Sequence, residues 1–285
     1  MTHRSPYIIC LSLALLLAGA PAARGAEPAS IAYGSDPAQQ IDVNAAQGTR
    51  GPAPIIVMVH GGGWRHGDKQ ARGVVRNKLE RWQPRGFLFV SVNYRMLPQA
   101  DVPTQAADVA RALAYVQTHA ASWGGDPDRV VLMGHSAGAH LAALLSADPT
   151  LATRAGARRW LGTVALDSAA LDVPSVMGRR HMPLYDKAFG SDPAFWRSVS
   201  PVDELTAQAV PLLAVCSTTR RDQPCRQAHA YADKAQALGA QAQVLEVAFS
   251  HGEVNAELGS DAAYTAGVER FMASLDPAFA ARLPR

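Results

Sequence analysis

Two glycine-rich stretches decide how this chain folds: His60-Gly61-Gly62-Gly63-Trp64 and Gly134-His135-Ser136-Ala137-Gly138. Each follows an apolar run that we expect to form a buried strand, Ile55 to Val59 before the first stretch and Val130 to Met133 before the second. A strand, a sharp turn with a serine between glycines, and then a helix would lift the serine hydroxyl out of the edge of a sheet. A glycine tract after an earlier strand leaves backbone N–H groups free to face an oxyanion. Together the two stretches predict nucleophilic chemistry by Ser136.

The first 26 residues have the composition of an export signal. Arg4 gives a positive start, Ile8 to Leu17 is apolar, and Ala20 to Ala26 offers small residues for cleavage. The apolar run is short for a membrane span, although an uncleaved anchor is the alternative, and no cysteine follows it as a lipid attachment site. We therefore expect an exported protein, periplasmic or secreted, without a stable membrane anchor.

Composition after the signal bounds the function further. The chain has 27 basic and 24 acidic residues, and removal of Arg4 and Arg24 leaves 25 and 24. This balance, without a cluster of lysines and arginines, argues against a nucleic-acid partner. The pairs Arg179-Arg180 and Arg220-Arg221, like Arg158-Arg159, are expected to be solvated rather than functional. The sequence gives no indication of the oligomeric state.

About 260 residues remain in the mature chain, and 48% of the full sequence is apolar. This length suits one large α/β domain, and neither a repeat nor a low-complexity linker divides it. Cys216 and Cys225 are the two cysteines outside the signal, and an even pair in an exported protein predicts a disulfide. Two free thiols are the alternative.

Strands and helices alternate along the chain. A hairpin at Ile31–Tyr33 and Gln40–Val43 should precede the main sheet. The expected later elements are strands at 55–59, 87–92, 130–133, 161–166, 211–215 and 243–247, and helices at 104–120, 137–145, 227–238 and 262–275, with another ending near 79–83. This alternation predicts a mainly parallel sheet covered by helices on both faces. The segment 173–205 departs from it and is the candidate for a lid over the substrate site.

A serine nucleophile needs a base, and the base needs an acid to orient it. The order Ser, Asp or Glu, then His is expected after such a turn. His251 follows the last predicted strand, in a loop, and is favoured over His181 and His229. Three aspartates follow strands in the right order. We favour Asp222 as the acid, with Asp167 and then Asp172 as alternatives, and the predicted disulfide would hold the loop of Asp222 against His251.

The glycine tract, Asn93-Tyr94-Arg95, Asp126 to Arg129 and the sequence GHSAGAHL from Gly134 to Leu141 resemble the α/β-hydrolase fold. More narrowly, they resemble esterases related to hormone-sensitive lipase, bacterial feruloyl and acetyl-xylan esterases, and arylformamidases. The resemblance implies that Ser136 is the nucleophile, His251 the base and Asp222 its orienter. It also implies an oxyanion hole formed by the backbone N–H groups of Gly62, Gly63 and Ala137, with His60 in a structural role.

The chain departs from this family pattern in two places. The acid loop from Cys216 to Asp222 is longer than usual, and little sequence precedes the first strand to form an N-terminal cap. Lid and loop residues would therefore shape the pocket, although the same side chains suit simple packing. These residues are Met177, His181, Leu184, Tyr185, Phe189, Phe195 and Trp196. Trp64 is expected mainly to pack.

The sequence thus predicts a serine hydrolase that cleaves carboxylic esters through an acyl-enzyme. The alternatives are an arylformamidase or amidase and, more remotely, a non-catalytic α/β-hydrolase scaffold that binds a ligand. No cofactor is indicated. Metal-assisted hydrolysis has no support, because the histidines are scattered and show no HExxH-like spacing.

Overall fold

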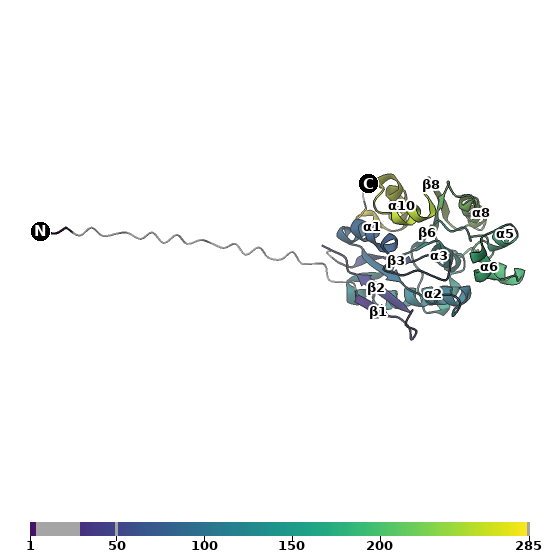
Figure 1. Ribbon diagram of the computed structural model, residues 1–285, viewed down its shortest axis with the longest axis horizontal. Helices are drawn as coiled ribbons and strands as arrows, with labels where there is room; N and C mark the ends of the chain where they lie inside the picture. Colours follow the sequence, from purple (N-terminus) through teal and green to yellow (C-terminus); the bar gives the residue numbers. More distant parts are fainter. Residues whose placement is uncertain (4–28, 49–50, 284–285) are drawn as a thin grey trace.

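The computed structural model describes residues 1–3, 29–48 and 51–283, and eight strands in this part of the chain form one sheet (Figure 1). The sheet order is β1-β2-β4-β3-β5-β6-β7-β8. The strands are β1 (Ala29–Ala32), β2 (Gln40–Asn44), β3 (Ala53–Val59), β4 (Leu88–Val92), β5 (Gly125–His135), β6 (Gly162–Leu166), β7 (Leu212–Ser217) and β8 (Ala242–Val247). β2 pairs antiparallel with both β1 and β4, and the strands from β4 through β8 in the sheet order are parallel.

The predicted mainly parallel sheet with helices on both faces is confirmed. β3 and β4 are buried along their full length, which is why they read as continuous apolar runs rather than as alternating patterns. The opening hairpin is β1 and β2, and the predicted later strands and long helices all form, with ends shifted by a few residues. The predicted signal and its cleavage sites lie outside the described residues, apart from residues 1–3.

Helices cover both faces of the sheet (Figure 1). The longer ones are α1 (Arg72–Trp82), α2 (Val102–His119), α3 (Ala137–Ala147), α8 (Pro224–Ala237) and α10 (Ala262–Leu275). The shorter ones are α4 (Thr150–Arg154), α5 (Val173–Met177), α6 (Pro183–Phe189), α7 (Pro193–Ser198), α9 (His251–Ala256) and α11 (Pro277–Ala280), and two 3-10 turns occupy Gln83–Arg85 and Ala120–Trp123.

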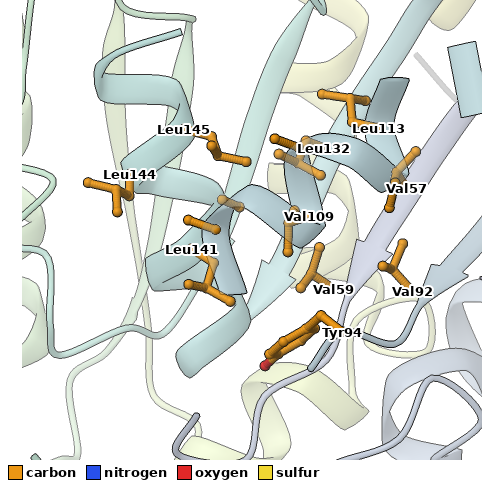
Figure 2. Packing of buried hydrophobic residues seen from close by; sticks show 14 of the residues in the cluster. Val57, Val59, Val92, Tyr94, Val109, Leu113, Leu132, Leu141, Leu144 and Leu145 are labelled. Carbon is orange, nitrogen blue, oxygen red and sulfur yellow. The ribbon is translucent and has the colours of Figure 1, made fainter. Parts of the chain in front are cut away.

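Alternate side chains of the central strands enter two separate cores. Val57 and Val59 of β3 face α2 and α3, where they pack with Val109 and Leu141 (Figure 2). The intervening residue Met58 faces the other way, into a cluster that includes residues of α1, α10 and α11. α3 is buried along its full length, since its small residues allow close approach to the sheet. The sheet therefore lies between buried apolar clusters on its two faces.

The strand register brings the ends of distant segments to one edge of the sheet. Val59 pairs with Gly134, so the glycine tract after β3 and the serine turn after β5 begin side by side. His135 pairs with Leu166, which places Asp167 next to Ser136. Ser217 at the end of β7 pairs with Val247 at the end of β8, just before the segment that carries His251. Ligand sites in such sheets lie at the carboxyl ends of the strands.

Candidate active site

Ser136 occupies the sharp turn between β5 and α3 that the sequence predicts. Its backbone has φ 56° and ψ −117°, a conformation that is rare for residues other than glycine and typical of strained functional turns. The following glycine allows the helix to start close to the sheet. A Cβ at Gly138 would lie 2.4 Å from the carbonyl oxygens of both Val59 and His60. The turn therefore depends on close backbone packing that only glycine permits.

His251 lies between the serine hydroxyl and a carboxylate. Its Nε2 is 2.9 Å from Ser136 Oγ, and its Nδ1 is 2.7 Å from Oδ2 of Asp167. His251 is the first residue of α9, which begins with a capping box in which Ser250 and Glu253 satisfy each other's backbone N–H groups. The histidine was expected in a loop. The sequence Ser250-x-x-Glu253 was the signal for this helix.

The acid that contacts His251 is Asp167, which corrects our preference for Asp222. The carboxylate of Asp222 instead pairs with Arg220, whose Nε lies 2.9 Å from Asp222 Oδ1. Asp167 is the first residue after β6 and is fully buried. Its carboxylate therefore contacts His251 from the end of the strand, whereas Asp222 lies further along a loop after β7. Asp172, the third candidate, accepts a hydrogen bond from the backbone N–H of Ser175 and caps α5.

The competing histidines have other partners. His181 lies 2.9 Å from Asp186, and His229 lies 2.8 Å from Glu246 on the surface. His135, inside the GHSAG stretch, was not singled out by the sequence. Its Nε2 is 2.9 Å from the carbonyl oxygen of His251, and burial lowers its pKa to about 3, so the neutral ring donates this hydrogen bond. His135 therefore holds the backbone of His251.

Asp167 is kept ionised in a buried position. Burial alone would raise its pKa, but the hydrogen bond with His251, the charge of Arg220 and the backbone N–H of Ser217 together lower the pKa below its usual value. Nη1 of Arg220 donates to the same Oδ2 at 2.7 Å. Nη1 and His251 Nδ1 lie 2.8 Å apart and share this acceptor. Because Nδ1 then carries the proton, Nε2 is left free to accept the proton of Ser136.

The backbone of the glycine tract lies beside Ser136. Gly62 and Gly63 have φ values of 123° and 59°, and both line one pocket together with Ser136 and Ala137, the first residue of α3. A Cβ at Gly62 would lie 1.9 Å from the carbonyl oxygen of His66, so a side chain cannot be accommodated there. The placement agrees with the oxyanion hole that the resemblance implies, which stays a prediction.

His60 lies behind this loop and away from the reacting atoms. Its ring stacks on Tyr94 with centroids 4.6 Å apart, and its Nδ1 is 2.7 Å from the carbonyl oxygen of Gly61. Burial lowers its pKa, so the ring is neutral. Trp64 is also largely a packing residue, since it is 3% exposed and its indole N–H lies 3.2 Å from His140 Nδ1.

The pocket around Ser136 has a volume of about 1240 Å³. The segment 173–205, expected as a lid, forms α5, α6 and α7, and Val176 and the residues from Arg179 to Tyr185 contribute to the wall. His181, Leu184 and Tyr185 line the pocket as predicted. Phe189 is instead buried against Trp64, with ring centroids 4.9 Å apart, and Met177, Phe195 and Trp196 are not among the lining residues.

Two of the arginine pairs expected to be merely solvated belong to this pocket. Arg179 and Arg180 come from the turn after α5, and Arg220 and Arg221 come from the loop between β7 and α8. No local sequence signal indicates this, because the two pairs are 40 residues apart and meet only in the fold. The structure therefore corrects the expectation for Arg179 and Arg220, which are hydrogen-bonded to protein groups, whereas Arg180 and Arg221 are exposed as expected.

The predicted disulfide joins Cys216 and Cys225 and closes the loop that holds Arg220, Arg221 and Asp222. Its anchor at Cys216 is buried in the sheet at the end of β7. The bridge thus fixes the acid loop as expected, although the residue this loop presents to Asp167 and His251 is Arg220.

Two features are absent from the residues that the structure describes. We find no group of three or more histidine, cysteine, aspartate or glutamate side chains there that could hold a metal ion. Within the same residues, no helix has the length and apolar character needed to traverse a bilayer.

Solved structures share this fold. The native esterase 2 of Thermogutta terrifontis superimposes with a TM-score of 0.69 at 21% sequence identity, over 88% of this chain and 93% of that one. A truncated carbohydrate esterase from gut microbiota gives a TM-score of 0.74 at 19% identity, over 89% of this chain and 98% of the other. The chain therefore shares the fold of these esterases, in agreement with the predicted α/β-hydrolase fold.

Sequence comparison gives a narrower similarity for part of the chain. Residues 41–156 match the family model BD-FAE, which confirms the resemblance that the motifs indicated. Esterase LipQ of Mycobacterium tuberculosis is 30% identical over 66% of this chain and 47% of its own length. The probable carboxylic ester hydrolase LipM of the same organism is 28% identical over 79% of this chain and 55% of its length.

A plant relative matches a shorter region. The probable isoprenylcysteine alpha-carbonyl methylesterase ICMEL1 of Arabidopsis thaliana is 36% identical over 40% of this chain and 23% of its own length. The chain thus spans between about a quarter and about half of the length of these curated relatives.

Proposed function

We propose that this protein is a serine hydrolase that cleaves carboxylic esters through an acyl-enzyme. The observation that carries the proposal is the continuous hydrogen-bonded path from Ser136 Oγ through His251 to the buried carboxylate of Asp167. A serine hydroxyl is a weak nucleophile at neutral pH, and this arrangement is what activates it. The path opens into a pocket lined by the N–H-bearing backbone of Gly62, Gly63 and Ala137.

Each group has a defined task in the proposed reaction. Ser136 Oγ attacks the ester carbonyl while His251 Nε2 takes the hydroxyl proton, and backbone N–H groups receive the negative charge on the carbonyl oxygen. Collapse of the tetrahedral intermediate breaks the bond to the alcohol, which leaves with the proton from His251. Water then attacks the acyl-enzyme with His251 again as the base, and the acid product and free Ser136 are released. Asp167 stabilises the imidazolium in both halves.

The similar proteins support this chemistry. LipQ and LipM carry esterase names, and the Thermogutta terrifontis esterase 2 has been solved phosphonylated by sarin and with propionate or butyrate bound. These ligands are small acyl groups or serine-directed inhibitors. We propose small or medium esters as substrates of this chain on the same basis.

Hydrolysis of 4-nitrophenyl acetate and butyrate tests the proposal directly. We expect turnover by the wild-type protein and a loss of at least about 10⁴-fold in Ser136→Ala, because the nucleophile is removed. An unchanged circular dichroism spectrum and melting temperature would show that the variant is folded. A folded wild-type protein without ester turnover would overturn the proposal. Faster cleavage of N-formylkynurenine than of the esters would instead indicate the formamidase chemistry of the alternative.

We also propose that the chain is exported. The apolar segment after Arg4 and the bridge between Cys216 and Cys225 support this location, because disulfides persist in oxidising compartments. Cell fractionation followed by N-terminal sequencing of the mature protein tests it. A protein that stays in the cytoplasm with its first 26 residues intact would contradict export.

A further inference from the structure

The walls of the pocket carry more positive than negative charge. Four arginines line it, in the pairs Arg179-Arg180 and Arg220-Arg221, against the single carboxylate of Asp222. The carboxylate of Asp167 contacts His251 on the side of the ring opposite Ser136. Of the four arginines, the ester hydrolysis proposed above accounts only for Arg220, which pairs with Asp167. It needs no cationic side chain to contact the substrate.

Two of these arginines are already bound by protein groups. Arg220 donates to Asp167 and forms an ion pair with Asp222, so both carboxylates near the site share this one cation. Arg179 donates through Nη2 to the backbone carbonyl oxygen of Asp222 at 3.0 Å. This hydrogen bond ties the turn after α5 to the loop between β7 and α8. It keeps the two arginine pairs on neighbouring walls of the pocket.

The other two arginines have no such partner. Arg180 and Arg221 are exposed, and neither side chain forms a hydrogen bond or ion pair with the part of the chain that the structure describes. Each follows a residue that is held in place, because Arg179 and Arg220 are both hydrogen-bonded. The disulfide at Cys216 further restricts the loop of Arg221. Two unpaired cations are thus presented at a concave surface, where low-dielectric walls strengthen their field.

The remainder of the pocket is largely apolar. Val176, Met182, Leu184 and Tyr185 come from the segment 173–205, and Ala169 and Ala170 come from the loop after β6. Such a surface accommodates a hydrocarbon or aromatic body. A guanidinium matches the two oxygens of a carboxylate through paired N–H donors.

We propose that the preferred substrate is an ester with an apolar body and a carboxylate, which Arg180 and Arg221 bind while Ser136 attacks the ester carbonyl. This inference rests on the ester hydrolysis proposed above and specifies its substrate class. The carboxylate belongs either to the acyl part, as in a monoester of a dicarboxylic acid, or to the alcohol part. Both sources present the same chemical group to the arginines.

Matched pairs of esters test the proposal and distinguish the two sources. For the acyl part, the mono-4-nitrophenyl ester of adipic acid is compared with its methyl-capped diester. For the alcohol part, 4-acetoxybenzoate is compared with its methyl ester. The measured quantity is the ratio of kcat/KM for the charged ester to that for the neutral ester. Comparing this ratio between variants cancels the intrinsic reactivity of the esters.

We expect the ratio to fall about threefold in Arg180→Gln and in Arg221→Gln and about tenfold in the double variant, for at least one of the two pairs. Partly exposed charge pairs are typically of this strength. The wild-type ratio should also fall when 0.5 M NaCl is added, because salt screens exposed charges. Arg226→Gln is the matched control: Arg226 is an exposed arginine on α8 that does not line the pocket. This variant removes the same charge and should keep the ratio within about twofold.

The outcomes separate this inference from the proposed function. Ratios that stay the same in the wild-type protein and the double variant, for both ester pairs, would overturn the carboxylate site even if neutral esters are cleaved in a Ser136-dependent way. A fall of equal size in Arg226→Gln would attribute the effect to overall charge and would also overturn it. Failure of the folded wild-type protein to cleave any ester would instead reject the proposed function.

Discussion

Asp167 combines several unusual properties in one residue. It has φ 54°, it is fully buried, and it accepts hydrogen bonds from His251, Arg220 and Ser217. Trp64, Ser136 and Gln223 are the other non-glycine residues with positive φ among those described, and all three line the pocket. Backbone strain of this kind persists where the surrounding structure holds it in place, which is typical of active sites.

Substitution of the two candidate acids gives the clearest residue-scale prediction. Asp167→Asn should lower kcat for 4-nitrophenyl butyrate by about 10⁴-fold, because an amide neither fixes the His251 tautomer nor stabilises the imidazolium. Asp222→Asn should lower it by no more than about tenfold, since Asp222 acts only through Arg220. Steady-state kinetics at pH 7.5 measures both. A larger loss in Asp222→Asn than in Asp167→Asn would return the role of acid to Asp222.

Sequence reasoning could identify Ser136 and His251 but not choose between the aspartates. The serine is marked by flanking glycines and the histidine by its place after the last strand, and both signals are local. Asp167 and Asp222 each follow a strand in the correct order, so order cannot separate them. What separates them is the adjacency of β5 and β6 and the pairing of Asp222 with Arg220. Both are contacts in space that the sequence does not encode locally.

Among the elements, the loop between β7 and α8 links the disulfide to the catalytic acid. Cys216 and Cys225 close a short loop, and Arg220 within it contacts both Asp167 and His251. Strand and helix positions were predictable from hydrophobic periodicity, whereas this loop has no regular pattern. Its conformation depends on a covalent bond and on ion pairs, which explains why the buried contacts of Arg220 could not be predicted from the sequence.

Loss of the bridge should lower stability and activity together. In Cys216→Ala/Cys225→Ala we expect the free energy of unfolding in urea to fall by about 2–3 kcal/mol, because the unfolded chain regains the entropy that closure of a loop of this length removes. Turnover should also decrease because Arg220 is less firmly held against Asp167. Dithiothreitol provides the control, since it should produce the same loss in the wild-type protein and no further change in the double variant. Equal stability of the oxidised protein and the double variant would contradict this account.

At the scale of the whole molecule, the site depends on buried neutral histidines that join separate parts of the fold. His140 in α3 lies 3.2 Å from the indole nitrogen of Trp64, and its Nε2 lies 2.7 Å from the carbonyl oxygen of Val199 beyond α7. It thus connects the glycine tract, the serine helix and the end of the segment 173–205. His135 similarly connects the serine turn to α9. Both ring nitrogens of His140 have partners that suit a neutral ring, so a second ring proton would remove the acceptor of the hydrogen bond from Trp64.

These histidines predict a loss of stability in acid. Burial lowers the pKa of His140 to about 4 and that of His135 to about 3, whereas both should titrate near 6.5 in the unfolded chain. Below pH 6.5 the unfolded state binds protons that the folded state excludes, so the free energy of unfolding should fall as the pH is lowered towards 4. Each ring should contribute about 2.5 kcal/mol of this loss between pH 6.5 and 4.5.

Urea unfolding at a series of pH values measures the effect. His140→Gln removes one titrating ring and keeps a polar side chain. Between pH 6.5 and 4.5, the free energy of unfolding of this variant should therefore fall by about 2.5 kcal/mol less than that of the wild-type protein. His229→Gln is the control, because His229 lies on the surface and its substitution removes no buried ring. The unfolding free energy of this variant should depend on pH as that of the wild-type protein does. Parallel profiles for His140→Gln and the wild-type protein would show that the buried histidines do not couple folding to pH.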